Sequence, residues 1–302
     1  MSPPIVYFNR HTEREETECV YGEKPLRWVY GSAPGRVALW LLVRRTFFSR
    51  WFGWRMRRRA SHSRILPFIK QYKLDPAQFA SPVANFRSFD EFFSRKLKAD
   101  ARPIDRADAL AVFPADGRHL GFQDASATAF IHAKGRRFDL SALLGDDALA
   151  ARYQHGALIC SRLCPVDYHR FHFPVAGIPS PVRLINGWLY SVNPIALRRN
   201  LAYLWENKRA ILTLDAGKWG IVTHVIIGAT NVGSMSFTYP AGTPAEKGDE
   251  MGFFSFGGSF VATLFEPGKI TLAPDLLRET NAGRELYAHF GSVLGYADAN
   301  RS

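Results

Sequence analysis

The pattern of apolar and polar positions divides the chain into a helical first third and a β-rich remainder. Within residues 36–59, five apolar side chains recur at intervals of three or four, a spacing that would align them on one stripe of a helix. They are Trp40, Val43, Phe47, Trp51 and Trp54. Two further helices are predicted at 63–72 and 88–98, the second with Ser88 as its N-cap. Residues 1–35 are expected to form an extended lead-in with turns.

After a polar connector at residues 99–106, the pattern changes to short apolar runs separated by turns. Runs of this kind, bounded mostly by Gly, Pro, Asn or Asp, are typical of β-strands. They lie at residues 157–163, 182–192, 211–214, 220–228 and 260–265. The sequence therefore predicts an α+β fold, with a helical N-terminal region over residues 1–106 and a β-rich domain over residues 107–302.

The positive charge of residues 36–59 suggests that the helical region binds an anionic partner. The chain carries a net charge of +12, and residues 36–59 hold eight arginines, six aromatic residues and no acid. The longest uncharged apolar run there, residues 37–43, is far shorter than the roughly 20 residues that a membrane-spanning helix needs. We therefore expect a helix that lies on an anionic membrane. Its contacts would be Trp40, Phe47, Trp51 and Trp54 among the headgroups and Arg44 and Arg45 on anionic lipid.

Two other readings of the basic segment remain open, a nucleic-acid surface and a core helix with a basic rim. No nucleic-acid-binding motif accompanies the charge, so no nucleic-acid partner is expected. The cysteines Cys19, Cys160 and Cys164 do not form a disulfide framework, and residues 1–35 contain no secretory signal. We therefore expect a peripheral protein on the cytoplasmic side of the cell membrane. A homodimer stays open.

The candidate chemistry begins at Gly257, Gly258 and Ser259, directly before a predicted strand. Two glycines leave the Gly258 carbonyl unshielded by any Cβ and permit backbone angles that other residues resist. A serine hydroxyl placed there could attack the preceding carbonyl, which would cut the chain. Taken alone, the same three residues are also typical of an ordinary hairpin turn.

Histidines and an aspartate elsewhere could assist such a step. His169 and His172 lie three residues apart among aromatic residues, and histidine is the side chain best suited to proton transfer near neutral pH. Asp116, in a Pro-Ala-Asp-Gly turn, is either a turn residue or the acid that orients a histidine. A zinc site at the two histidines is the alternative. No other ligands stand at a familiar spacing, so no metal is expected.

With these motifs in hand, the chain resembles the pyruvoyl-dependent phosphatidylserine decarboxylases, the bacterial-type proenzymes, along nearly its whole length. The agreement occurs in the same order at many separate points, which is more specific than any single motif. The matching segments are residues 7–10, 20–24, 88–97, 101–104, 114–117, 167–172, 189–194, 232–234, 247–254 and 257–259.

The resemblance implies roles for the candidate residues. His172, oriented by Asp116, would act as the base on Ser259, whose hydroxyl attacks the Gly258 carbonyl and splits the chain into a β chain (1–258) and an α chain (259–302). The covalent cofactor would be a pyruvoyl group derived from Ser259. The substrate would be phosphatidylserine and the products phosphatidylethanolamine and CO2. His169 would assist the decarboxylation.

Phe260 departs from the family, which usually has a small hydroxyl residue, mostly threonine, after the serine. In a strand, side chains alternate between faces, so Phe260 would point away from the face that Ser259 shares with Val261. We therefore expect Phe260 to pack into a core and to be tolerated. Two alternatives remain: a catalytically silent, membrane-bound homologue that Phe260 has disabled, and a zinc hydrolase that uses His169 and His172.

Overall fold

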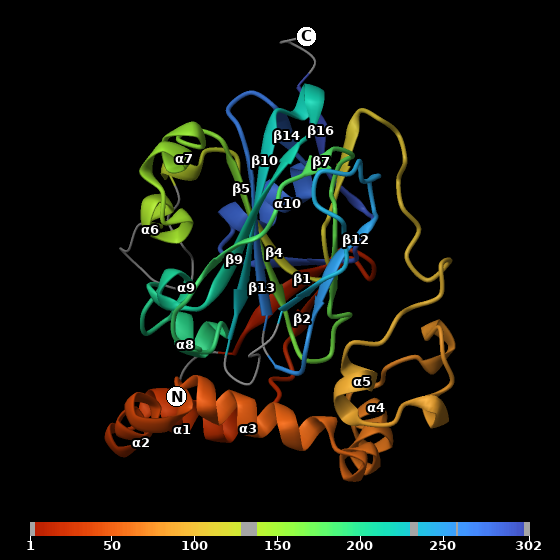
Figure 1. Cartoon of the computed structure of the whole chain (residues 1–302), viewed down its shortest axis with the longest axis vertical. Coiled ribbons are helices and arrows are strands. Elements are labelled where there is room, and N and C mark those ends of the chain that lie inside the picture. Colours follow the sequence, from red (N-terminus) through yellow and green to blue (C-terminus); the bar gives the residue numbers. More distant parts are fainter. Residues whose placement is uncertain (1–3, 128–137, 230–234, 258, 299–302) are drawn as a thin grey trace.

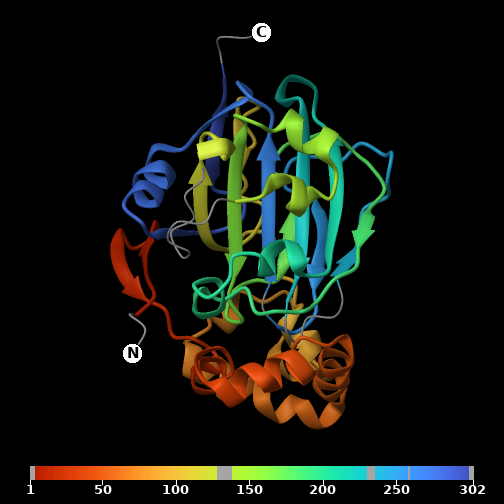
Figure 2. The same ribbon diagram turned by 90° about the vertical axis from the view of Figure 1, so that its left-hand side faces the viewer.

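The computed structural model describes residues 4–127, 138–229, 235–257 and 259–298. A β-rich body stands on a layer of helices, which lies at the bottom of Figure 1 and again in the turned view of Figure 2. The described strands form one ten-stranded sheet and two three-stranded sheets. The α+β prediction is therefore confirmed, and the division at residue 106 stays a prediction.

The large sheet runs in the order β2-β1-β15-β4-β5-β13-β10-β9-β7, and β8 also pairs with β9. Its pairs are antiparallel except for β1 with β15. Its strands are β1 (Val6–Asn9), β2 (Arg14–Thr17), β4 (Gly117–Phe122), β5 (Ala157–Leu163), β7 (Ile178–Pro179), β8 (Arg183–Ile185), β9 (Arg209–Asp215), β10 (Ile221–Gly228), β13 (Ser259–Phe265) and β15 (Glu285–Ala288).

The two smaller sheets share one hydrophobic core with the large sheet. One has the order β11-β12-β6, with β11 (Met235–Phe237), β12 (Glu250–Phe254) and β6 (Arg170–His172). The other has the order β14-β16-β3, with β14 (Ile270–Leu272), β16 (Val293–Ala297) and β3 (Leu110–Val112). Short helices border the body: α6 (Leu140–Leu144), α7 (Asp147–Arg152), α8 (Pro194–Leu197), α9 (Tyr203–Glu206) and α10 (Pro274–Asn281). Figure 2 shows α6 to α9 in front of the large sheet.

Four of the five predicted strands are confirmed as β5, β9, β10 and β13, within two residues at each end. The prediction for 182–192 was too long, because β8 ends at Ile185. At Gly187 the backbone passes so close to a neighbouring segment that a Cβ would lie 2.4 Å from the Glu206 carbonyl oxygen. This close crossing replaces the regular ladder with a single bridge between Trp188 and Asn207.

The helical layer is more broken than the sequence predicts. It contains α1 (Glu23–Gly31), α2 (Ala33–Ala38), a π-helical turn (Leu39–Val43), α3 (Thr46–Arg57), a 3-10 turn (Arg59–Arg64), α4 (Ile65–Tyr72) and α5 (Phe89–Phe93). The single helix over 36–59 was wrong, because Arg45 has extended backbone angles (φ −81°, ψ 142°) and ends the run. Residues 1–35 are also more ordered than expected, since they form β1, β2 and α1.

Ser88 is confirmed as the N-cap of α5, with its Oγ accepting a hydrogen bond from Glu91 N at 3.3 Å. The predicted helix over 88–98 was too long, because α5 ends at Phe93. The chain beyond it turns back to form a bridge between Leu97 and Phe79.

The two faces of β13 belong to two different cores. Val261 packs on one face with Phe171 and Phe254, whereas Phe260 lies on the other face with Ala262 and Leu264. Phe260 is 2% exposed. The expectation that this ring packs into a core away from the face of Ser259 is therefore confirmed.

The turn before β13 is anchored in the helical layer. Phe256 is buried in an aromatic cluster with Phe89 and Phe93, with ring centroids 5.2 and 4.9 Å away. Its backbone N–H donates to Asp90 Oδ1 at 3.0 Å. Because one residue of the turn is held by the helical layer, that layer helps to fix the position of Ser259.

Candidate active site

Ser259 begins β13, where its neighbours in the ladder are Leu163 on β5 and Gly228 on β10. The residue is fully buried, and its Oγ makes no hydrogen bond among the described residues. Gly257, two positions earlier, has φ +144°, a backbone conformation that glycine adopts readily and other residues rarely do. The predicted cleavage position Gly258 lies outside the described residues. The structure thus places a buried, unbonded hydroxyl directly after a turn that needs glycine.

His169 lies beside this turn. Its carbonyl accepts a hydrogen bond from Phe254 N at 2.9 Å, and its ring centroid lies 3.9 Å from that of Phe93. The Gly257 backbone also contacts the imidazole. His169 Nδ1 donates to the Asp167 carbonyl at 3.0 Å, because a carbonyl oxygen can only accept.

His172 is held in a similar way, three residues further along the chain in β6. Its Nδ1 donates to the Gly248 carbonyl at 3.0 Å, and its ring stacks on Phe290 with centroids 3.7 Å apart. With both Nδ1 atoms donating, the neutral form of each imidazole carries its lone pair on Nε2. Both Nε2 atoms are buried and make no hydrogen bond among the described residues, so either histidine can accept a proton.

Burial keeps both histidines neutral. It lowers the pKa of His169 to about 3 and that of His172 to about 4. Smaller charge effects act on both rings. Asp116 raises the pKa of each histidine, Arg95 lowers that of His169, and for His172 the raising effect of Glu250 is larger than the lowering effect of Arg170. The imidazolium of His172 is therefore the better stabilised of the two.

Asp116 does not bond to His172, which corrects the predicted arrangement. Its carboxylate accepts hydrogen bonds from the Arg102 guanidinium at 2.6 to 3.1 Å and from Phe290 N at 2.9 Å. The ring of Phe290 in turn stacks on His172. Asp116 is therefore linked to His172 through Phe290, while the Gly248 carbonyl fixes the tautomer of the histidine.

We expect Asp116→Ala to destabilise the protein and to slow maturation strongly. The change leaves the partly buried Arg102 guanidinium and the Phe290 N–H without their acceptor. Removing one partner of a fully buried ion pair costs about 3–5 kcal/mol, and we expect a loss at the lower end of this range. Urea unfolding and a time course of chain cleavage would measure the two effects. Asp108→Ala, at an exposed position nearby in the sequence, is the control and should change neither. Wild-type cleavage by Asp116→Ala would contradict this role.

A buried ionic network that the sequence analysis missed lies next to the site. Arg162 donates to Glu18 at 2.6 Å and to Glu285 at 2.5 Å, and Arg118 donates to Asp167 at 2.5 Å. The four segments involved are far apart in the chain, so no local sequence pattern predicts the network. Glu285 lies after residue 258, whereas its partner Arg162 lies before it, so this ion pair crosses the predicted cleavage position.

Two cavities adjoin these residues. The interface cavity, of about 640 Å³, lies between the helical layer and the sheet, and Phe256 and Gly257 form part of its wall. Its remaining lining is largely apolar and comes mainly from residues 18–22, from α1 and from residues 162–166. The Arg95 cavity, of about 200 Å³, is polar and is lined by Arg95, Asp116 and Tyr168 among others. Val166 lines both cavities.

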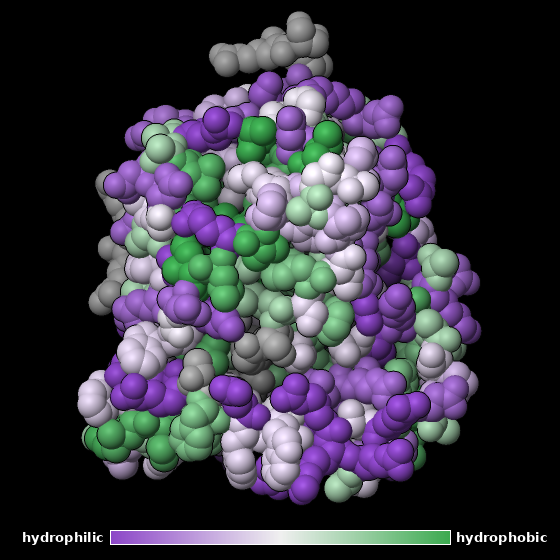
Figure 3. All heavy atoms as spheres, in the orientation of Figure 1, coloured by the Kyte–Doolittle hydropathy of each residue, from purple (hydrophilic) through white to green (hydrophobic). Residues whose placement is uncertain are grey.

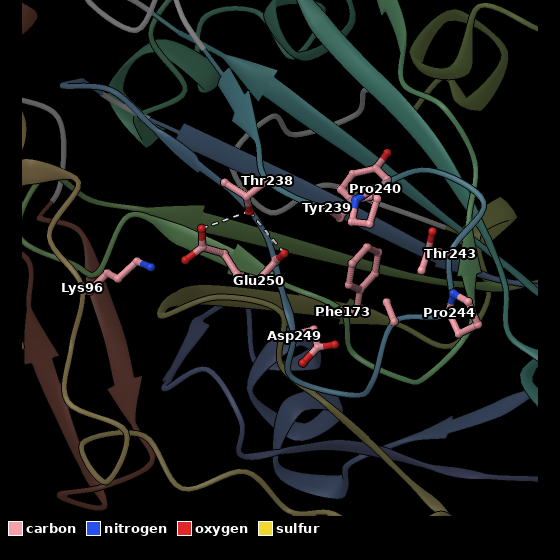
Figure 4. A pocket seen from close by; sticks show the side chains of 10 residues that line it. Lys96, Phe173, Thr238, Tyr239, Pro240, Thr243, Pro244, Asp249 and Glu250 are labelled. Atoms are coloured by element: carbon pink, nitrogen blue, oxygen red, sulfur yellow. Dashed lines mark hydrogen bonds between the residues drawn. The ribbon is translucent and has the colours of Figure 1, made fainter.

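A third pocket, of about 360 Å³, lies beside β12 and is lined by Glu250, Thr238, Tyr239 and Lys96 among others (Figure 4). Thr238 Oγ1 donates to Glu250 Oε1 at 3.0 Å, and Glu250 also pairs with Arg170. The predicted catalytic residues do not line this pocket. We therefore place the candidate site at Ser259 and the two histidines.

The aromatic residues predicted to bind a membrane are exposed on the helical layer. Trp40, Phe47, Trp51 and Trp54 are between 46% and 62% exposed. Figure 3 shows apolar side chains gathered at the lower left, where Figure 1 draws α1 and α2, beside hydrophilic ones along the lower edge. Within the described residues, the helices are too short or too polar to cross a bilayer.

The two arginines predicted to bind lipid are less free than expected. Arg44 and Arg45 lie over the ring of Trp188 at 4.1 and 5.0 Å, and Arg44 also donates to the Tyr190 hydroxyl at 2.9 Å. These contacts tie the helical layer to the β-rich body. As for metals, the described part of the chain holds no group of three or more His, Cys, Asp or Glu that could bind an ion.

Known proteins match this chain along most of its length. The profile of the phosphatidylserine decarboxylase family matches residues 89–289. A phosphatidylserine decarboxylase proenzyme of Chlamydia caviae is 41% identical over 291 residues, covering 96% of this chain and 97% of that protein. A protein of the same name from Desulfitobacterium hafniense is 38% identical over 297 residues, covering 98% of this chain and all of that protein.

Proposed function

The chain belongs to the phosphatidylserine decarboxylase family, and we propose that it matures by cutting its own backbone between Gly258 and Ser259. Its reaction removes the carboxylate of phosphatidylserine as CO2 and leaves phosphatidylethanolamine. The buried Ser259 hydroxyl carries the proposal for maturation. A buried polar group without a hydrogen bond costs free energy, so its presence calls for a functional explanation.

In the proposed cleavage, His172 Nε2 accepts the proton of the Ser259 hydroxyl while Oγ adds to the Gly258 carbonyl carbon. The bond from that carbon to the Ser259 nitrogen breaks, and the nitrogen takes up the proton, so an ester replaces the amide. Loss of the Ser259 Cα proton then expels the Gly258 carboxylate from Cβ. Addition of water and release of ammonia leave a pyruvoyl group at the start of the second chain.

The residues around Ser259 fit such a group. Its carbonyl would supply an acceptor for the electron pair that remains when CO2 leaves the substrate. His169, against the turn at Gly257, would hold the substrate or return a proton to it. We assign the cleavage to His172, because Glu250 favours its protonated form whereas Arg95 disfavours that of His169.

The two chains would stay together after cleavage. The strand β13 is paired along its length with β5 on one side and β10 on the other, so separating it would break two ladders. The ion pair between Arg162 and Glu285 also joins the two chains in a buried setting. The interface cavity, which ends at Phe256 and Gly257, supports entry of a lipid from the side of the helical layer.

Mass spectrometry of the purified protein tests this function directly. We expect a second chain that starts at residue 259 with a pyruvoyl group and ends at Ser302, together with CO2 release from phosphatidylserine. An intact chain without turnover would favour the silent homologue, in which Phe260 prevents cleavage. Stoichiometric zinc with hydrolytic activity would favour the hydrolase.

We further propose that the helical layer holds the protein on the cytoplasmic face of the cell membrane. Four exposed aromatic residues and the exposed arginines Arg36, Arg50, Arg57 and Arg59 support this. A basic residue near an anionic surface contributes about 1 kcal/mol, whereas inserted rings contribute independently of salt. Such docking would bring the interface cavity to its lipid substrate.

Replacing the four exposed aromatic residues Trp40, Phe47, Trp51 and Trp54 by serine should abolish most binding to anionic liposomes. Salt should release the wild-type protein only in part, because it screens the arginines and leaves the rings inserted. Flotation with and without 1 M salt measures both effects. The control variant replaces Leu184 and Tyr296, which are exposed on the β-rich body, and should float like wild type. Equal, salt-insensitive binding to neutral liposomes would refute the electrostatic part.

A further inference from the structure

Arg95 is a buried guanidinium without an acidic partner among the described residues. It follows α5 and is 5% exposed. Its hydrogen bond runs from Nη1 to the Phe92 carbonyl at 3.3 Å, and its Nε is buried and unbonded. The rings of Phe79 and Phe92 lie 4.9 and 4.8 Å from its Cζ. Because arginine has five N–H donors, most of its hydrogen-bonding capacity is unused.

The nearest carboxylates are already engaged. Asp116 is held by Arg102 and Phe290 N, and Asp167 by Arg118 and Cys164 N at 2.5 and 2.6 Å. Both attract Arg95 electrostatically without accepting a hydrogen bond from it. Burial lowers the pKa of Arg95 to about 10, so it remains charged at neutral pH. A buried charge with unused donors is costly unless a further acceptor completes its environment.

The Arg95 cavity has the size and chemistry for such an acceptor. It measures about 200 Å³, whereas a water molecule takes about 30 Å³, so it has room for a tetrahedral anion and some water. Its wall also carries the cations Lys73 and Arg102 and the Tyr168 hydroxyl. It includes the carboxylates of Asp75, Asp116 and Asp167 as well, but Asp116 is paired with Arg102 and Asp167 with Arg118, which leaves Arg95 and Lys73 as the cations without such a pair. The planar guanidinium fork is well suited to two oxygens of one phosphate.

We propose that the Arg95 cavity binds a phosphate-type oxyanion through the Arg95 guanidinium. If the proposed function holds, its source is the phosphodiester of the substrate headgroup. His169 lies close enough to Arg95 for their charges to interact, and Val166 separates this cavity from the interface cavity that would hold the lipid tails. The phosphodiester is unchanged by decarboxylation, so its contact stabilises ground state and transition state alike and acts on KM.

The experiment compares Arg95→Gln with Lys96→Gln, which removes an exposed neighbouring cation. Arg95→Lys serves as a second variant that keeps the charge but loses the fork, in case Arg95→Gln folds poorly. In one arm, each change is placed in uncleaved Ser259→Ala protein, and the thermal midpoint is measured with inorganic phosphate against chloride at equal ionic strength. We expect phosphate to raise the midpoint of the parent and of Lys96→Gln, but not that of Arg95→Gln.

In the other arm, KM and kcat are measured on cleaved protein with a short-chain phosphatidylserine. Losing a charged hydrogen bond should raise KM about ten- to a hundredfold in Arg95→Gln, with kcat nearly unchanged.

The two arms together identify the source of the oxyanion. A raised KM in Arg95→Gln, with or without the phosphate effect, shows that Arg95 binds the phosphodiester of the substrate headgroup. If Arg95→Gln loses the phosphate-induced rise of the thermal midpoint but keeps its KM, the cavity binds a free anion instead of the substrate headgroup. Unchanged KM together with equal midpoint shifts in parent and Arg95→Gln overturns the proposal. Failure of wild type to turn over substrate refutes the proposed function, and the phosphate arm then decides the cavity alone.

Discussion

Ser259→Ala is expected to give a single uncleaved chain without decarboxylase activity. Alanine has no hydroxyl to attack the preceding carbonyl, so neither the second chain nor its pyruvoyl group can form. The free energy of unfolding should stay within about 1 kcal/mol of that of the uncleaved wild-type precursor, because the lost Oγ makes no hydrogen bond among the described residues. A denaturing gel, mass spectrometry and urea unfolding measure these three properties.

Ser161→Ala is the matched control for this result. Ser161 is also fully buried, lies on the neighbouring strand β5, and bonds through Oγ to His119 Nδ1 at 2.9 Å. Its variant should lose some stability yet cleave normally. Normal processing of Ser259→Ala would remove Ser259 from the mechanism. Loss of processing in both variants would show that cleavage depends on general packing of the two strands.

His172→Ala should also block cleavage, whereas His169→Ala should cleave and then turn over substrate at least a hundredfold more slowly. The difference follows from their surroundings, since general acid–base groups typically contribute about 10²- to 10⁴-fold and carboxylates favour the protonated form of His172. Because burial lowers the His172 pKa to about 4, its neutral form predominates at pH 7.5 and still at pH 5.5. The cleavage rate should therefore stay nearly flat between these values, where a histidine with an ordinary pKa would lose most of its activity.

His224→Gln is the control for the histidine pair. His224 is buried, has a pKa lowered to about 3, and also has an unbonded Nε2, but it lies on β10 against Thr263. This variant should cleave at the wild-type rate. If His172→Ala cleaves fully and His169→Ala does not, the two roles are exchanged. His169, whose imidazole contacts the Gly257 backbone, would then be the base in the cleavage.

The local sequence pattern determined four of the strands, β5, β9, β10 and β13, and the orientation of residues on them. Alternation of side chains has a period of two residues in any strand, so the opposite faces of Ser259 and Phe260 could be read before their surroundings were known. The same holds for the Ser88 cap, which depends on a bond to Glu91 three residues away. The candidate residues Ser259, His169, His172 and Asp116 came from short motifs and the family resemblance.

The tertiary structure alone decided which groups meet. Asp116 pairs with Arg102 and Phe290 instead of His172, and β1 finds its partner in β15 near the other end of the chain. Arg95 is a buried cation only because α5 and the segment after it fold against the β-rich body. Such contacts join segments that the sequence separates by many residues, and their geometry depends on how all the layers pack. The sequence by itself therefore determined part of the local conformation and the candidate residues for the chemistry, whereas packing determined their partners, burial and pKa values.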